Sequence, residues 1–137
     1  MNSWQLAFSN RFDYGAYDDI VLPVTLSSDI ANQVLLRPKL DTGSTFCVFQ
    51  RLYADLLGLD VERGVPQIIK TATGSFAAHG HEITLTVGQL EWQAIVYFAE
   101  DESFPVNVVG RRGFLDRLRA GLVDYEQLLY VSSYDES

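Results

Sequence analysis

The residues with the clearest chemical potential lie in one short run, Leu40-Asp41-Thr42-Gly43-Ser44. An acid that follows an apolar residue and precedes a glycine is typical of a tight turn at the end of a strand. The glycine lets another backbone approach closely, and the threonine and serine place hydroxyl groups beside the carboxylate. Such a carboxylate can take up or release a proton. The same triplet also occurs in ordinary polar turns, so its meaning depends on a second segment of the chain.

The second segment runs from Phe104 to Arg112 and reads Phe-Pro-Val-Asn-Val-Val-Gly-Arg-Arg. Together the two segments resemble the retropepsins, the single-domain aspartic proteases of retroviruses, and their retropepsin-like relatives in bacteria and eukaryotes. The run from Leu40 to Ser44 is similar to the family's apolar-Asp-Thr-Gly-Ala/Ser motif, and Val-Val-Gly-Arg over 108–111 is similar to its second signature. The resemblance implies a retropepsin-like aspartic protease domain over 20–131. An N-terminal extension or strand over 1–19 is expected before it, and a polar tail over 132–137 after it.

Length and composition are those of a globular protein. The 137 residues are expected to form one domain, long enough to remove about two thirds of its unfolded surface from water. The formal net charge of −8 argues against binding to a phosphate backbone, so no nucleic acid partner is expected. No signal for secretion is visible and no apolar run approaches ~20 residues, so we expect no membrane association and a cytoplasmic location. Cys47 is the only cysteine, and its apolar neighbours predict a packed core thiol.

Short apolar and β-branched runs, punctuated by glycine and proline, predict a mostly β, barrel-like fold. Strands are expected over 4–12, 20–26, 33–36, 46–49, 67–73, 76–87 and 92–98, with a closing hairpin over 121–131. Apolar residues at helical spacing predict one short helix over 51–57 and a second over 111–119. Pro38 predicts a kink ahead of the Asp41 turn. Combined with the resemblance, these elements predict a retropepsin-like closed barrel with two short helices that assembles as a homodimer.

Peptide hydrolysis by carboxylates needs two of them sharing one proton, so that one activates water and the other polarises the carbonyl. The chain has one Asp-Thr-Gly, so the second carboxylate is expected to come from Asp41 of another copy in a symmetric homodimer. The resemblance implies that Thr42 ties the two turns together across the two-fold axis and that Gly43 lets the substrate backbone approach. Ser44 is expected to donate a hydrogen bond to the Asp41 carboxylate, which favours the charged form. Activity is expected to peak in mildly acid solution, without a cofactor or a metal.

A hairpin over 68–84, with Thr73-Gly74-Ser75 at its tip, resembles the flap that closes over substrate in this family. A tip glycine absorbs the hinge motion, and backbone amides there can hold a substrate. Val106 and Val108 are expected to line apolar pockets, which predicts cleavage between apolar or aromatic residues. The alternative for this segment is an ordinary surface hairpin.

Other residues depart from the family pattern or lie outside it. Viral enzymes pair the arginine that corresponds to Arg111 with an acid at the position of Thr45, so Arg111 is expected to find another partner or to face solvent. His79 and His81 share one face of a strand, and we interpret them as an exposed pair on the flap rather than a metal site. The sheet that joins two copies is expected to use 128–131.

The leading interpretation is therefore a homodimeric aspartic endopeptidase that acts on a peptide or protein substrate. The alternative is a protease-derived module that dimerises and holds peptides without cutting them. The intact Asp41 triplet favours the enzyme, whereas the absence of an acid at Thr45 and the kink at Pro38 keep the binding module open.

Overall fold

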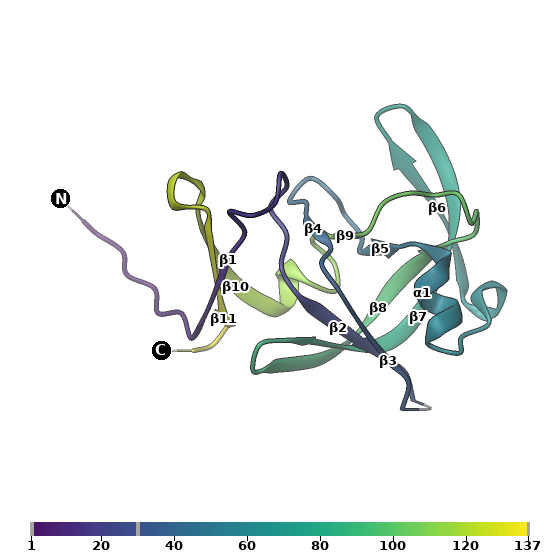
Figure 1. Cartoon of the computed structure of the whole chain (residues 1–137), viewed down its shortest axis with the longest axis horizontal. Helices are drawn as coiled ribbons and strands as arrows, with labels where there is room; N and C mark the ends of the chain where they lie inside the picture. The colour runs from purple at the N-terminus through teal and green to yellow at the C-terminus, as the bar shows by residue number, and fades with distance from the viewer. Residues whose placement is uncertain (1, 30, 137) are drawn as a thin grey trace.

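The computed structural model describes residues 2–29 and 31–136, and β-strands dominate it (Figure 1). In chain order the elements are β1 (Asn10–Asp13), β2 (Val24–Ser27), β3 (Gln33–Leu36), β4 (Lys39–Leu40), β5 (Val48–Phe49), α1 (Arg51–Leu56), η1 (Val61–Arg63), β6 (Val65–Thr71), β7 (Gly74–Val87), β8 (Leu90–Ala99), β9 (Val108–Val109), η2 (Leu115–Arg117), β10 (Leu118–Val123), η3 (Asp124–Glu126) and β11 (Leu128–Ser133). None of the helices in these two ranges is long and apolar enough to cross a membrane.

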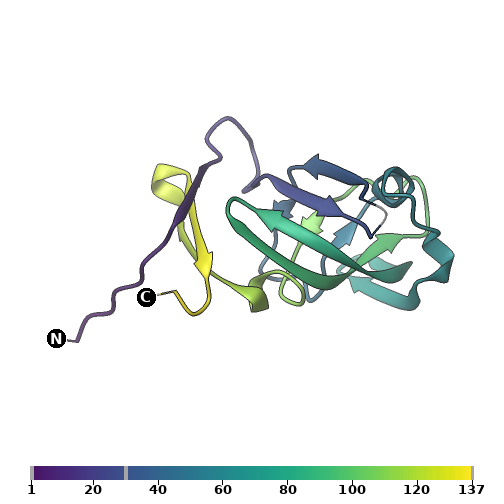
Figure 2. The same cartoon turned by 90° about the horizontal axis from the view of Figure 1, so that it is seen from below.

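The larger sheet has the strand order β3-β2-β7-β8-β5-β9-β4, and β6 adds to β7 outside this path. The sheet curls into a half-barrel, as the two views in Figures 1 and 2 show. Its far strand β4 returns to the segment before β2, because Lys39 forms an isolated bridge with Val21 and the Leu40 N–H donates to the Ile20 carbonyl at 2.8 Å. Arg37 and Pro38 interrupt the ladder between β3 and β4, but Lys39 pairs with Val21 in the register in which Leu36 pairs with Val24, so the kink predicted at Pro38 stays a prediction.

The long hairpin of β7 and β8 supplies much of the core because its apolar residues alternate along each strand. Ile83, Leu85 and Val87 of β7 are at most 3% exposed, and Val96 and Phe98 of β8 are fully buried. The main core also contains Leu22, Val24, Leu26, Phe49, Leu57, Phe114, Leu129 and Val131. Helix α1 packs on this curl where a helix was predicted, with Ala54 fully buried.

A second, three-stranded sheet has the order β1-β11-β10 and lies beside the curled sheet (Figures 1 and 2). Strand β11 is in its centre and is paired on both sides, so the free edges belong to β1 and β10. Residues 128–131 lie in this central strand, and their expected part in a sheet that joins two copies stays a prediction. The Tyr14 hydroxyl donates a hydrogen bond to the carboxylate of Asp124 beside this sheet. Burial is the main cause and this hydrogen bond a smaller cause of the rise in the pKa of Tyr14 to about 12.

Two predictions near the C-terminus are wrong. The helix expected over 111–119 is reduced to the single turn η2, because Phe114 has φ −131° and Leu118, with φ −148°, is already extended and begins β10. Both side chains are buried, so the apolar spacing marked burial and not a helix. The tail expected from Ser132 also begins later, since β11 runs to Ser133 and Ser132 is fully buried. At the other end the strand expected over 4–12 is shorter and begins at Asn10.

Candidate active site

Asp41 lies on the turn that directly follows β4. Leu40 pairs with Val109 of β9 in a parallel ladder, and the Asp41 N–H donates to the Val109 carbonyl at 3.0 Å. The Gly43 N–H donates to Oδ1 of Asp41 at 3.0 Å, and the Ser44 N–H donates to the Asp41 carbonyl at 3.1 Å. The half-buried carboxylate is thus held by the backbone of its own turn, as predicted for an acid at the end of a strand.

The second sequence signature, Val-Val-Gly-Arg over 108–111, contacts the loop after Asp41 through backbone hydrogen bonds. The N–H of Arg111 donates to the Ser44 carbonyl at 2.9 Å, and the N–H of Arg112 donates to the Thr45 carbonyl at 2.8 Å. Gly110 allows this contact, because a Cβ there would lie 2.4 Å from the Ser44 carbonyl oxygen. The two motifs that carry the family resemblance are therefore in direct backbone contact.

The predicted hydrogen bond from Ser44 to Asp41 is wrong. The Ser44 hydroxyl instead donates to the carbonyl of Phe46 at 2.7 Å, two residues further along the chain. A serine at this position closes its own loop through a short-range bond, so it does not reach back to the acid. Ser44 still borders the cavity that Asp41 faces.

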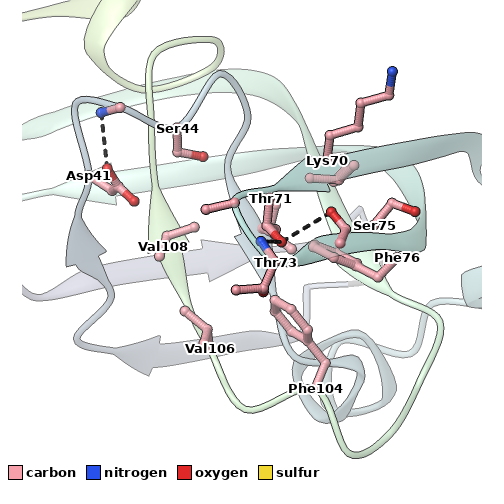
Figure 3. Close-up of a pocket in the computed structure, with 15 residues that line it drawn as sticks. Asp41, Ser44, Lys70, Thr71, Thr73, Ser75, Phe76, Phe104, Val106 and Val108 are labelled. Atoms are coloured by element: carbon pink, nitrogen blue, oxygen red, sulfur yellow. Dashed lines mark hydrogen bonds between the residues drawn. The ribbon is translucent and has the colours of Figure 1, made fainter.

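This cavity has a volume of about 690 Å³ and brings most of the predicted site residues together (Figure 3). Its polar side is formed by the Asp41 turn and by the tip of the β6–β7 hairpin. Its lining consists of Asp41, Gly43, Ser44, Val48, Ile69, Lys70, Thr71, Ala72, Thr73, Gly74, Ser75, Phe76, Phe104, Val106 and Val108. Four apolar residues of this wall, Val48, Ile69, Phe76 and Phe104, were missed from the sequence. Ile69 and Phe76 are paired across the hairpin, so the correct position of its turn would have predicted that these two residues lie opposite each other.

The hairpin turns at Ala72 and Thr73, between the paired residues Thr71 and Gly74, so the tip lies one residue before the predicted Thr73-Gly74-Ser75, and Gly74 and Ser75 begin β7. The Thr71 hydroxyl donates to the Gly74 carbonyl at 3.1 Å and accepts a bond from the Thr73 N–H at 3.4 Å. Gly74 has φ 157°, and a Cβ added there would meet no atom within 4 Å. Because the tip borders the same cavity as Asp41, the hairpin is placed as a flap would be.

Thr42 is the predicted site residue that does not border the cavity. It is exposed and lines a neighbouring hollow of about 430 Å³ with Thr45, Arg111, Arg112, Leu115 and Asp116. Arg111 faces solvent, and it makes no ion pair with any side chain of residues 2–29 and 31–136. The Asp41 turn therefore has one face in the cavity and another that is open to the outside.

Cys47 and the two histidines lie near the site. Cys47 is fully buried, accepts a bond from the Gly110 N–H and donates to the Arg112 carbonyl, each at 3.4 Å. Burial raises the pKa of its thiol to about 12, which agrees with the predicted core thiol. The prediction of an exposed histidine pair is wrong: His79 is only 9% exposed and His81 is half-buried, with Nε2 at 2.9 Å from the Val61 carbonyl.

Comparison with known proteins defines the class of fold. No protein-family model and no curated protein sequence matches the chain. Among solved structures, it is similar to a retropepsin-like aspartic protease from Rickettsia conorii, with 16% identity and a TM-score of 0.64 over 89% of this chain and 98% of that one. It is also similar to the EIAV protease complexed with the inhibitor HBY-793, with 18% identity and a TM-score of 0.55 over 73% of this chain and 88% of that one.

The chain therefore has the retropepsin-like aspartic protease fold, a mostly β fold built on a curled half-barrel sheet. The family resemblance drawn from the two motifs is confirmed at the level of structure. The 20–131 segment that carried it contains the curled sheet and most of the small one.

Proposed function

We propose that the chain is an aspartic endopeptidase that works as a symmetric homodimer and hydrolyses peptide bonds in a peptide or protein substrate. The observation that carries this proposal is the position of Asp41: its carboxylate accepts a hydrogen bond from the Gly43 N–H at the edge of a largely apolar cavity, and a hairpin tip borders the same cavity. An extended peptide would lie between the Asp41 turn and the hairpin, with apolar side chains against Val106 and Val108. The open face at Thr42 is where a second copy would complete the site.

The proposed reaction uses two carboxylates that share one proton. The ionised Asp41 takes a proton from a water molecule, whose oxygen attacks the peptide carbonyl carbon, while the protonated Asp41 of the partner subunit gives its proton to the carbonyl oxygen. Collapse of the tetrahedral intermediate breaks the C–N bond: the Asp41 that took the water proton gives it to the leaving nitrogen, and the ionised Asp41 of the partner subunit takes a proton from a hydroxyl of the intermediate, which restores the single shared proton. Gly43 leaves room for the substrate backbone, and the amides of Thr73, Gly74 and Ser75 hold it from the flap side.

The test is a peptide-library digest with wild type, Asp41→Asn and Asp55→Asn. Asp55 is exposed on α1 and is absent from the cavity lining, so Asp55→Asn controls for the loss of one acidic charge. We expect wild type and Asp55→Asn to cut between apolar residues, most rapidly in mildly acid solution and with inhibition by pepstatin, and Asp41→Asn to be inactive. A wild-type protein that binds peptides without cutting them would support the binding module instead.

The homodimer is tested in the same three proteins by light scattering. Wild type is expected to have twice the mass of one chain at micromolar concentration, because one chain supplies one Asp41. Asp41→Asn removes two facing carboxylates that cannot both ionise cheaply, so it should dimerise at neutral pH at least as well as wild type. A mass of one chain for wild type at high concentration would contradict the shared site.

A further inference from the structure

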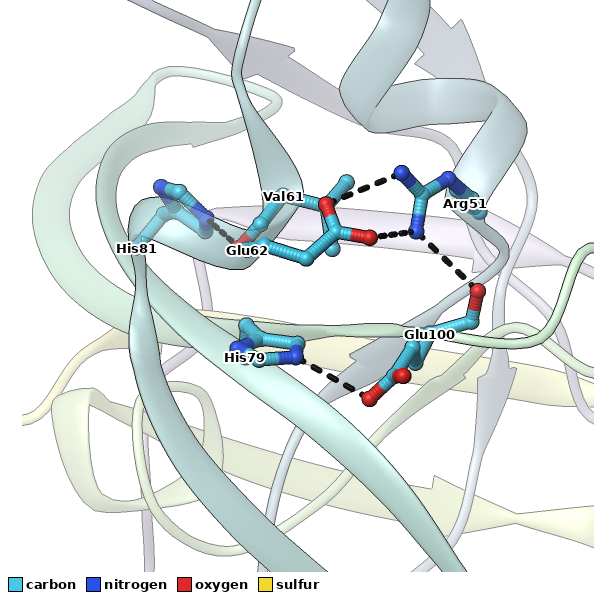
Figure 4. A network of polar contacts seen from close by, with 6 residues as sticks. All are labelled: Arg51, Val61, Glu62, His79, His81 and Glu100. Atoms are coloured by element: carbon cyan, nitrogen blue, oxygen red, sulfur yellow. Dashed lines mark hydrogen bonds and ion pairs between the residues drawn. The ribbon is translucent and has the colours of Figure 1, made fainter.

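Glu100 connects the flap strand β7 to the segment 100–107, which we call the wall segment because its Phe104 and Val106 line the cavity. The Glu100 N–H donates to the Ala77 carbonyl at 3.0 Å, and its carboxylate lies 3.2 Å from Nε2 of His79. Its carbonyl accepts a hydrogen bond from Nη1 of Arg51 at 3.1 Å (Figure 4). Glu100, the first residue of the wall segment, is therefore in contact with both the flap strand β7 and helix α1.

His79 makes this contact at an energetic disadvantage. Its side chain is buried, and Nδ1 has no hydrogen-bond partner within residues 2–29 and 31–136. A neutral ring that donates from Nε2 to the carboxylate leaves Nδ1 as a buried acceptor without a donor. An aliphatic residue would fill this position of β7 without an unpaired polar atom. The contact with Glu100 is what distinguishes histidine from such a residue.

A second ion pair supports the same junction. Arg51 contacts both carboxylate oxygens of Glu62, at 2.7 and 2.9 Å, and Glu62 lies in η1 just before the other flap strand, β6. This hydrogen-bonded pairing raises the pKa of Arg51 and lowers that of Glu62. The charged groups around His79 are therefore Glu100, Glu62 and Arg51, and they link the bases of both flap strands to the wall segment (Figure 4).

The remainder of the wall segment is held at two further points. Phe104 packs on Phe76 of the flap, with ring centroids 4.4 Å apart and an angle of 32° between the rings. Asn107 exchanges two hydrogen bonds with Gln50, at 2.9 and 2.8 Å. The segment is thus anchored at Glu100 and Asn107, and between these anchors it presents Phe104 to the cavity.

We propose that His79 is a positioning residue of the peptide-binding cleft: by donating to Glu100 it holds the wall segment against β7, so that Phe104 stays stacked on Phe76 and limits the size of side chain that the cleft accepts. The effect on peptides rests on the proposed function, whereas the effect on the wall segment does not. Removal of the donor should loosen the wall segment at its first anchor and leave the Asp41 turn unchanged, because none of the contacts of His79 involves that turn.

The experiment compares three substitutions in the full chain. His79→Leu removes the donor, and His79→Gln keeps an amide N–H that can reach Glu100 from the same position. His81→Leu is the matched control, because it lies in the same strand and its Nε2 contacts Val61 and not the wall segment. Glu100→Ala removes the acceptor of the contact. Because the Glu100 side chain is half-exposed, this variant takes the place of His79→Leu if His79→Leu fails to fold.

Hydrogen exchange without substrate is the first measurement. We expect amides of 100–107 to exchange about tenfold faster in His79→Leu and Glu100→Ala, the change that corresponds to about 1.4 kcal/mol. Exchange should be close to wild type in His79→Gln and in His81→Leu. Unchanged exchange in both His79→Leu and Glu100→Ala, or no recovery in His79→Gln, would overturn the proposal, because a residue that only fills space would not be rescued by an amide donor.

Peptide kinetics are the second measurement. The KM of His79→Leu should rise about tenfold with kcat nearly unchanged, and larger side chains should be accepted beside Val106. Loss of kcat at unchanged KM would also overturn the proposal, since it would place the effect at the Asp41 turn. If no variant and no wild-type protein cuts any peptide, the proposed endopeptidase fails, and the exchange experiment still decides the role of His79.

Discussion

Gly110 provides the sharpest test of how the two sequence motifs make one site. A Cβ at this position would lie 2.4 Å from the carbonyl oxygen of Ser44 and 2.6 Å from that of Phe46, where ordinary contact begins at 3.4 Å. Both neighbours are backbone atoms, so the clash cannot be relieved by a side-chain rotation. Gly110→Ala should therefore push the loop that follows Asp41 away from β9 by about 1 Å, which is 3.4 minus 2.4 Å.

The expected cost follows from this shift. Overpacking of this kind typically destabilises by about 1–3 kcal/mol, which for a chain of this length lowers Tm by about 4–12 °C. A 1 Å displacement of a catalytic group can reduce turnover by about 100-fold. The loss of activity per folded molecule should therefore be far larger than the loss of stability alone would cause at 25 °C.

Val109→Ala is the matched control, because Val109 is the fully buried neighbour of Gly110 in β9. It removes two methyl groups from the main core and should cost about 2 kcal/mol without displacing the Asp41 loop. Thermal unfolding and peptide cleavage measured on both variants separate the two effects. If Gly110→Ala kept the activity of Val109→Ala at equal folded fraction, the proposed support of Asp41 by Gly110 would be refuted.

Two further predictions concern the flap tip and the buried thiol. Gly74→Val should lower turnover several-fold with Tm nearly unchanged, because φ 157° suits glycine and the site is open; unchanged kinetics would show that Gly74 plays no part in flap closure. The pKa of Cys47 is raised from 9.0 to about 12 in the folded chain, so the stability it contributes is present below pH 9 and is lost as pH rises from there toward 12. Between pH 8 and 10 wild type should therefore lose up to about 1.4 kcal/mol more stability than Cys47→Ala, which denaturant titrations at the two pH values would measure, and parallel losses in both proteins would contradict it.

The sequence was most informative where local chemistry and chain order agree. The Asp41 turn and the hairpin over 68–84 depend on residues within a few positions of each other, and both are found where they were predicted. The spacing of Phe114 and Leu118 also predicted burial correctly. It could not distinguish a helix from a turn followed by a strand, because both place these two side chains in the core.

Contacts between distant segments were the part that the sequence could not provide. His79 was predicted to be exposed as part of a flap strand, yet it is buried and contacts Glu100, 21 residues away. The Ser44 hydroxyl was expected to donate to the Asp41 carboxylate, but the geometry of the loop places it on the Phe46 carbonyl instead. The pairing of β1 with β11 likewise joins residues near opposite ends of the chain.

The site and the flap share a small core of their own, which bears on how the flap can move. Val48, Ile69, Ala78 and Val108 form a buried cluster apart from the main core, and Phe46, Phe76, Tyr97 and Phe104 pack against it. Ala78 is fully buried in this cluster, whereas the turn at Ala72 and Thr73 is exposed. A rigid swing of the whole hairpin would have to expose Ala78 and separate it from Val108. Val108 lies in β9, the strand that also supports the Asp41 turn. Bending between Phe76 and the tip breaks far less apolar contact, so we expect flap opening to be confined to the outer turns of the hairpin, with its base fixed to the catalytic turn.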